Sequence, residues 1–420
     1  MNKALVNKIL ITFGFLLVYR ILAYVPVPGV DISVIKEFFD TNSNNALGLF
    51  NMFSGSAVER LSIISLGIMP YITASIVMEL LSATFPALGK LKKEKDGMQK
   101  YMQIIRYVTI GITIVQAIGV SFGLNSVTGA TGRSSVMIDQ ETFTFITVVT
   151  MLTGTMLLMW IGEQITQKGL GNGISLIIFA GIVSSIPSAI GGTFELINTG
   201  ALNILLAIIM VLVILATIGI IIYIELAERR VAISYSRKMM MQNQNKRVMN
   251  YIPIRINLSG VIPPIFASAI LTFPATMLQT ATADYLVFLR DLLTPGSYGF
   301  NAIMFFLVMF FSFFYASIAF KADDISDNLK KQGGFIPGVR PGGATKDFIN
   351  DIASRLTYTG AFYLACISTL PWVILQEMSI PFYFGGTAVL IIVQVAIDTM
   401  RKIEAQIYMD KYQTVGVMGL

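Results

Sequence analysis

The sequence predicts an all-α membrane protein with ten membrane-spanning helices, and three observations lead to this fold class. Hydrophobic residues make up 55% of the 420 residues and charged residues only 13%, against about 25% in soluble domains. Apolar runs of about 20 residues, the length that crosses a bilayer's hydrocarbon core, recur along the whole chain. Lys and Arg gather in alternate segments between these runs.

Ten apolar runs have the length of a membrane span. They cover residues 9–25, 61–84, 104–124, 142–162, 173–190, 202–224, 258–278, 300–320, 356–375 and 382–400. The first run follows Lys3 and Lys8, as in a signal peptide, but no small-residue cleavage site comes after it. We therefore expect it to remain as the first span.

The positive charges support this count and orient the chain. With the N-terminus inside, 25 of the 30 Lys and Arg fall in inside segments. Such an asymmetry is the usual mark of cytoplasmic loops, so we expect both termini to be cytoplasmic. The exceptions are Arg20, Lys36, Arg60, Arg133 and Arg290.

Composition also excludes several kinds of chemistry. The chain has no histidine, so imidazole metal ligands and Ser-His or Cys-His nucleophile pairs are absent. Cys366 is the single cysteine, which rules out an internal disulfide. No G-x-x-x-x-G-K-[ST] phosphate-binding loop occurs. We expect no enzymatic activity, no catalytic or metal-binding residues and no cofactor.

Two inside loops, 225–257 and 321–355, are too long to be simple turns. One interpretation is that their basic residues only fix orientation and touch anionic lipid. The other is that they form a docking surface for a cytosolic partner. In the first loop Tyr235, Ile252 and Ile254 alternate with basic residues, which indicates ordered structure and favours docking.

Glycine and proline mark two special places between and within spans. Gly169, Gly171 and Gly173, with Asn172, predict a tight inside hairpin between the fourth and fifth spans. The adjacent prolines 263 and 264 predict a bend in the seventh span, either a plain kink or a place of movement.

Isoleucines recur at helical spacing in two spans. The pairs Ile72/Ile76 and Ile174/Ile178 are each four residues apart, so each pair shares one helix face. That pattern fits a face toward lipid or a neighbouring helix. It also fits a hydrophobic constriction, which blocks ions by excluding water.

Charges inside the predicted spans are few: Arg20, Glu79 and Asp398. An ion-coupled transporter places carboxylates near the middle of the bilayer, and none of these occupies such a position. The sequence therefore speaks against an inverted-repeat transporter of small solutes. A receptor or scaffold without a pore leaves the broken segment before the second span unexplained.

Five blocks of sequence resemble the SecY family, the central channel subunits of the bacterial Sec protein translocase. The blocks are SLGIMPYITASI (65–76), WIGEQITQKGLGNGISLIIFAG (160–181), PIRINLSGVIPPIFASAILTFPATM (253–277), NLKKQGGFIPGVRPG (328–342) and FYFGGTAVLIIV (382–393). The resemblance covers nearly the whole chain. Glu79 departs from it, because the family usually has glutamine there, and places a negative charge near the inner end of the second span.

The resemblance implies two inverted five-helix halves around a central pore, with a plug helix and a lateral gate between the second and seventh spans. The halves are residues 1–190 and 202–400, joined by a hinge at 191–201 and followed by a cytoplasmic tail at 401–420. The broken segment at about 49–60 is implied to be the plug, which fills the outer funnel of the resting channel. Its matching residues are Phe50, Asn51, Met52, Phe53, Ser54 and Gly55.

A ring of six isoleucines at the waist of the pore is also implied. These are Ile72, Ile76, Ile174, Ile178, Ile265 and Ile391. The implied function is to pass unfolded secretory polypeptides across the cytoplasmic (inner) membrane and to release hydrophobic segments sideways into lipid.

The implied partners are the SecE and SecG subunits, the SecA motor ATPase, the ribosome, secretory and membrane protein precursors, and the lipid bilayer. The two long inside loops become the docking site for SecA or the ribosome. The residues expected to dock are Arg340, Arg229, Arg230, Arg237 and Lys238.

Overall fold

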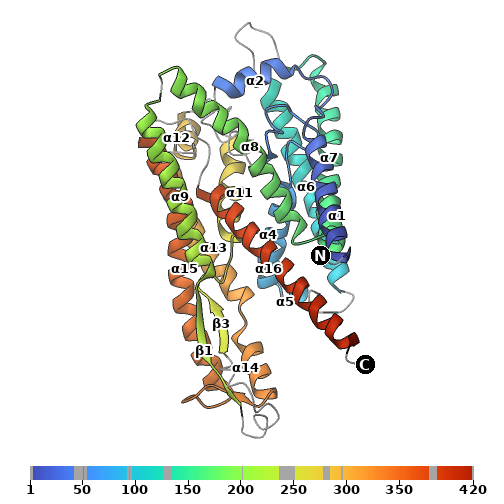
Figure 1. Ribbon diagram of the computed structural model, residues 1–420. Helices are drawn as coiled ribbons and strands as arrows, with labels where there is room; N and C mark the ends of the chain where they lie inside the picture. The colour runs from blue at the N-terminus through green and yellow to red at the C-terminus, as the bar shows by residue number, and fades with distance from the viewer. Residues whose placement is uncertain are drawn as a thin grey trace.

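The computed structural model describes residues 3–41, 51, 54–91, 94, 97–125, 135–200, 202–235, 251–277, 284–294, 297–377 and 386–418. Each of the ten predicted spans overlaps a separate helix (Figure 1). In chain order these are α1 (Lys3–Leu22), α4 (Met69–Thr84), α6 (Gly97–Asn125), α7 (Gln140–Lys168), α8 (Gly173–Asn198), α9 (Ile204–Leu226), α11 (Ile262–Met277), α13 (Tyr298–Ala319), α15 (Gly343–Glu377) and α16 (Gly386–Met418).

Short elements join these helices. The short helices are α2 (Ile32–Thr41), α5 (Pro86–Leu91), α12 (Asp284–Leu292) and α14 (Ala322–Lys331). The strands are β1 (Glu228–Ala232), β2 (Ser234–Tyr235), β3 (Tyr251–Arg255) and β4 (Gly334–Phe335). In Figure 1, α2 and α12 lie at the top, and α14 with β1 and β3 lies at the bottom.

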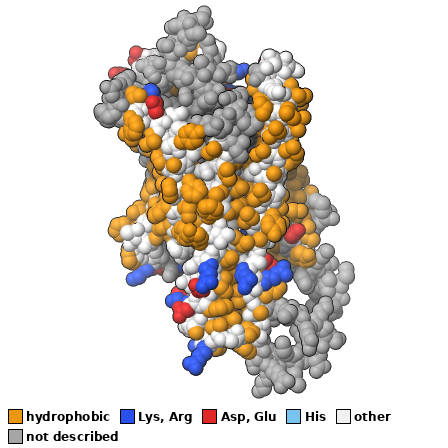
Figure 2. Space-filling model, turned by 90° about the vertical axis from the view of Figure 1, so that its left-hand side faces the viewer, with side chains coloured by type: hydrophobic (Ala, Val, Ile, Leu, Met, Phe, Trp, Pro, Cys, Tyr) orange, Lys and Arg blue, Asp and Glu red, His pale blue; other side chains and the backbone are white. Residues whose placement is uncertain are grey.

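By length and composition alone, six helices of the described chain qualify as membrane spans: α1, α6, α7, α8, α9 and α13. A shorter apolar helix covers Ile262–Leu271. Large apolar side chains are exposed on these helices, including Phe13, Tyr107, Phe145 and Phe306. Figure 2 shows hydrophobic side chains over the middle of the molecule and Lys and Arg side chains below them. This distribution suits a surface that faces lipid rather than water.

The helices pack as two groups that meet at two seams. In the first group α6 packs on α4 and α7, and α1 packs on α7 and α8. In the second, α13 packs on α11 and α15, and α16 packs on α9 and α15. The groups meet where α4 contacts α11 and where α8 contacts α16. One apolar cluster contains buried residues from both groups, so the core of the molecule lies at these seams.

The second predicted span begins later than expected. Residues 61–68 form turns, and α4 starts only at Met69, with Pro70 in its first turn. Proline suits that place because the first turn of a helix needs no backbone N–H partner. The prediction of a helix from residue 61 is therefore wrong by about two turns.

The bend predicted at Pro263 and Pro264 is also wrong. Helix α11 begins at Ile262, so both prolines lie in its first turn and start the helix instead of bending it. The proline that does lie inside α11 is Pro274.

Within their described residues, the two long loops predicted to lie inside form strands and contact each other. Strand β1 pairs with β3 within the first loop, and β2 of the first loop pairs with β4 of the second. Val231 and Ile254 share a small apolar cluster with Leu329 of α14 and Ile349 of α15. We call these strands, α14 and the start of α15 the inside module. An all-helical reading missed its strands, although the alternation at 252–254 indicated order.

The predicted hinge at 191–201 lies mostly within a helix. Gly191 and Gly192 are inside α8, which continues to Asn198. The chain then turns and enters α9, whose first turn is capped by Asn203 accepting from the backbone N–H of Leu205.

Candidate pore and plug

Six isoleucines from four helices lie in or against one apolar cluster. Five of them are at most 9% exposed, and Ile174 is half-buried and packs on the same cluster. They come from α4 (Ile72, Ile76), α8 (Ile174, Ile178), α11 (Ile265) and α16 (Ile391). Because these side chains are covered, the isoleucines of α4 and α8 face the interior of the protein and not lipid.

The six isoleucines come from the four helices that form the two seams, α4 with α11 and α8 with α16. α11 contacts α4 on one side and α13 on the other. On the α13 side, Phe266 meets Phe311 and Tyr315 edge to face, with ring centroids 5.9 and 6.5 Å apart. Such aromatic pairs add a directional preference to apolar packing. α11 therefore has a specific aromatic contact with α13.

The segment between α2 and α4 is closed on itself by Asn51. The side chain of Asn51 donates to Glu59 Oε2 at 2.9 Å and accepts from the Glu59 backbone N–H at 3.1 Å. Its backbone carbonyl accepts from Ser56 N at 2.8 Å and from the Ser54 hydroxyl at 3.0 Å. We call residues 51–60 the plug segment. Phe50, Met52 and Phe53 lie outside the described residues.

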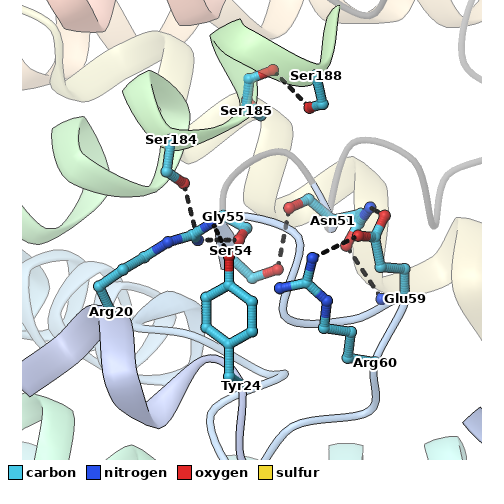
Figure 3. Close-up of polar contacts among 10 residues, drawn as sticks. All are labelled: Arg20, Tyr24, Asn51, Ser54, Gly55, Glu59, Arg60, Ser184, Ser185 and Ser188. Carbon is cyan, nitrogen blue, oxygen red and sulfur yellow. Dashed lines mark hydrogen bonds and ion pairs between the residues drawn. The ribbon is translucent and has the colours of Figure 1, made fainter.

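The end of α1 holds the plug segment through backbone carbonyls. Tyr19 Oη donates to the carbonyl of Ser54 at 3.1 Å, and Arg20 Nη1 donates to the carbonyl of Gly55 at 2.7 Å. The same Arg20 nitrogen donates to Ser184 Oγ on α8 at 3.1 Å (Figure 3). Three segments distant in sequence therefore meet at one guanidinium.

Gly55 has the conformation and the space that only glycine satisfies. Its φ is +69°, and a Cβ there would lie 2.8 Å from Ser184 Oγ and 3.1 Å from the Cα of Gly181. A side chain would thus be strained by the backbone and would press the segment away from α8.

The residues after the plug segment pair with the residues after α1. Val27 N donates to the carbonyl of Leu61 at 2.8 Å, and Ile63 N donates to the carbonyl of Val25 at 2.9 Å. This short extended pairing ties the start of α4 to the end of α1.

The predicted inside hairpin between α7 and α8 is confirmed as a tight turn. Gly171 has a φ of +84°. Thr166 Oγ1 accepts from Gly173 N at 2.9 Å, and Asn172 caps α8 by accepting from Ile174 N at 3.2 Å. Gly171 thus supplies the left-handed backbone that this turn needs.

The family model for SecY matches residues 62–400 of this chain. The chain belongs to the SecY family. It is 66% identical, over the full length of both chains, to the protein translocase subunit SecY of Helicobacter pylori (strain ATCC 700392 / 26695). It is 38% identical to the Escherichia coli (strain K12) protein of the same name, covering 97% of this chain and 93% of that one.

Solved structures share the fold of this SecY family member. A structure described as a protein conducting channel matches with a TM-score of 0.69 at 17% identity, over 96% of this chain and 93% of that one. Canine Sec61 in a ribosome-channel complex matches with a TM-score of 0.64 at 17% identity, over the same shares of the two chains. At such identity the match establishes the architecture, and the residues must be argued from their own contacts.

A buried polar cluster in this SecY family chain was missed by the sequence analysis. Glu225, Asn257 and Gln394 are only 3%, 4% and 4% exposed. Asn257 Nδ2 donates to Glu225 Oε1 at 2.6 Å. The side-chain nitrogen of Gln394, turned toward the carboxylate, donates to Glu225 Oε2 at 2.7 Å. The cluster joins the end of α9, the approach to α11 and the first third of α16.

The sequence carries almost no signal for this cluster. Glu225 was assigned to the start of a loop, and 32 residues separate it from Asn257. Asn257 also accepts from Ser259 Oγ at 3.1 Å and from Gly260 N at 3.0 Å. The side-chain oxygen of Asn257 thereby fixes the backbone that leads into α11. Both carboxylate oxygens of Glu225 thus accept hydrogen bonds from buried amides.

Three of the five residues expected to dock partners lie on the inside module. Arg229, Arg230 and Arg340 are all exposed. Arg230 Nε donates to Glu228 Oε1 at 2.9 Å, and its guanidinium lies 4.8 Å from the ring centroid of Tyr251. The hydrogen bond to Glu228 raises the pKa of Arg230. Arg237 and Lys238 lie outside the described residues.

Proposed function

We propose that this chain is the protein-conducting channel of a Sec-type translocase. It passes unfolded secretory polypeptides across the membrane and releases hydrophobic segments sideways into lipid. The observation that carries the proposal is the meeting of six isoleucines from four helices in one apolar cluster, in a chain of the SecY family. The names of its relatives, protein translocase subunits, support the same function.

The six isoleucines form the pore ring in this proposal. Isoleucine is bulky and apolar and offers no hydrogen bond that would hold a passing backbone. A ring of such side chains excludes water and ions when no chain is present. Their burial supports a resting channel in which the ring is closed on itself.

The plug segment covers the ring from the outer side at rest, and the seam between α4 and α11 is the lateral gate. At that seam the two helices touch without a covalent or salt-bridge connection among the described residues. Parting them opens a path from the ring to lipid. The two groups of helices, 1–190 and 202–400, move against each other about the turn between α8 and α9.

The chain lies in the cytoplasmic membrane with both termini inside. The positive charges of the inside segments support this orientation. So does the position of the inside module at the end of the molecule opposite α2 and α12 (Figure 1). Arg229, Arg230 and Arg340 on this module bind acidic surfaces of a motor ATPase such as SecA or phosphates of ribosomal RNA.

The chain performs no catalysis itself in this proposal. The driving energy comes from the docked motor or from the ribosome that makes the precursor. Small SecE- and SecG-type subunits cover part of its exposed apolar surface, and the bilayer covers the rest.

A cysteine crosslink tests the channel. Cys366→Ser removes the native thiol, and Ile265→Cys places one at the ring. Membranes containing this variant receive the motor ATPase, ATP and a precursor with one cysteine and a folded block that stalls it midway. We expect an ATP-dependent disulfide between the two chains.

The matched control is Phe306→Cys, an exposed apolar position on α13. Position 306 must stay free of crosslink under the same conditions. A stalled precursor that never crosslinks to position 265 would exclude a path through this ring.

A further inference from the structure

The plug segment is held by three side chains at the end of α1: Tyr19, Arg20 and Tyr24. We call them the α1 clasp. Tyr19 and Arg20 donate to the carbonyls of Ser54 and Gly55. The ring of Tyr24 lies 4.1 Å from the guanidinium carbon of Arg60. The clasp thus contacts the plug segment at its middle and at its end.

Arg20 is the central member of the clasp. Its Nη2 donates to the Tyr24 hydroxyl at 3.1 Å, while its Nη1 is shared by the Gly55 carbonyl and the Ser184 hydroxyl. Hydrogen bonds from a guanidinium are stronger than neutral ones, and its planar fork fixes their directions. One side chain therefore joins α1, the plug segment and α8 (Figure 3).

Arg60 is the weaker contact at the other end. Its ion pair with Glu59 is long, at 3.7 Å, and between neighbours in sequence. Its Nη1 is covered and has no partner among the described residues. A covered donor without a partner costs free energy in the seated state. The directional hold on the segment therefore falls to Arg20, with the hydrogen bond of Tyr19 beside it.

We propose that Arg20 is a positioning residue that keeps the plug segment seated, and that separation of its guanidinium from the Gly55 carbonyl is required for the segment to leave. This rests on the proposed channel function. Because Arg20 also binds Ser184, a displacement of α8 relative to α1 breaks the contact. Movement of the helices around the pore is thereby linked to release of the plug segment.

Thiol labelling at residue 54 tests the clasp without any transport step. Ser54 is buried under the clasp, so Ser54→Cys in a Cys366→Ser background places a protected thiol in the plug segment. The full chain, with its translocase subunits in nanodiscs, is treated with a charged maleimide. We expect Arg20→Gln to raise the labelling rate about tenfold, a shift of about 1.4 kcal/mol in the opening equilibrium.

Two further variants are expected to give intermediate labelling rates at residue 54. Arg20→Lys keeps the charge but loses the fork, and Ser184→Ala leaves the bond to Gly55 intact. We expect each to raise labelling less than Arg20→Gln does. The matched control is Arg290→Gln on α12, which removes an equal charge whose described partner is its neighbour Asp291. Labelling in this control stays at the parental rate.

The native thiol of Cys366, in chains that retain Ser54, reports on the rest of the fold. Faster labelling at 54 with unchanged labelling at 366 supports the clasp. Unchanged labelling at 54, faster labelling at both positions, or an equal rise in Arg290→Gln overturns it. The precursor crosslink at 265 is scored separately in the parental chain, so failure of the channel proposal and failure of the clasp give different results.

Discussion

The isoleucine ring and the plug segment share one apolar cluster, which Ala57 joins from the plug segment, but they are held differently. The ring isoleucines contact their neighbours through apolar side chains. The plug segment is also held by hydrogen bonds to its own backbone, from Tyr19 and Arg20 and within Asn51–Glu59. The ring depends on non-directional packing, whereas the plug segment adds directional contacts to it.

This difference suits two separate tasks of such a channel, sealing around a passing chain and holding a plug in a fixed position. Apolar contacts have no preferred direction, so in the proposed channel a ring of isoleucines can close around chains of different sequence. Hydrogen bonds need a fixed geometry, so the contacts from Tyr19 and Arg20 define one position of the plug segment. Each prediction below breaks or sharpens this contrast.

The largest effect is expected in the ring. Ile391→Ala removes a side chain that is fully buried and leaves a cavity, which costs about 2–5 kcal/mol of unfolding free energy. Thermal unfolding in detergent measures this loss. Ile208→Ala, at an exposed apolar position on α9, is the control and is expected to change stability by about 0.5 kcal/mol or less. Equal losses would mean that the ring is not packed.

A smaller loss is expected where polar contacts lie beside the same core. Glu225→Leu leaves the buried amide nitrogens of Asn257 and Gln394 without their acceptor, at a cost of about 1–3 kcal/mol. Glu225→Gln keeps one acceptor oxygen and is expected to lose less. Thermal unfolding measures both losses. The control is Glu195→Leu, at an exposed position on α8. No loss in Glu225→Leu contradicts a structural role for this carboxylate.

Two glycine substitutions are predicted to separate the effect of backbone strain from the effect of steric crowding at the plug segment. Gly55 and Gly333 have nearly the same φ, +69° and +68°, but only Gly55 has neighbours within 4 Å of a new Cβ. Each alanine substitution costs about 1–2 kcal/mol for the left-handed backbone. Only Gly55→Ala is also expected to expose the plug segment to thiol labelling at residue 54. If residue 54 is labelled equally in both variants, the close contact of Gly55 with α8 does not keep the plug segment in place.

The smallest effect is expected on the surface of the inside module. Lys346 Nζ lies 2.7 Å from Asp323 Oδ1, and this hydrogen bond raises the pKa of Lys346. Asp323→Asn is predicted to return the pKa toward its ordinary value of about 10.4. NMR of methylated lysines across the alkaline range measures the change.

The sign of this linkage is set by the raised pKa. The protonated amine stabilises the fold fully below the unfolded-state pKa, and this contribution disappears as pH rises through the folded-state pKa. At pH 6–8 this contribution is fully present, but exposed ion pairs contribute little, so the unfolding temperature should barely change in Asp323→Asn. A clear loss at neutral pH would show that the surface pair carries more stability than exposed pairs normally do.

Properties that depend on local composition were readable from the sequence. The ten helices follow from apolar runs, the tight hairpin at Gly169–Gly173 from its glycines, and the expected orientation from the spacing of Lys and Arg. The helix starts at Met69 and Ile262 were misjudged because hydropathy does not separate apolar turns from apolar helix. Pro70 and Pro263 carried the better signal, since proline favours a first helical turn.

Tertiary structure alone decided which distant groups meet. Periodicity left Ile72 and Ile76 facing either lipid or protein, and only the packing of α4 against its neighbours placed them inside. The pairing of β2 with β4, the joining of Glu225 to Asn257 and Gln394, and the hold of Arg20 on Gly55 each connect segments far apart in sequence. Hydropathy and helix spacing are properties of neighbouring residues, whereas such contacts arise from how whole helices pack, and for that reason they appear only in the folded chain.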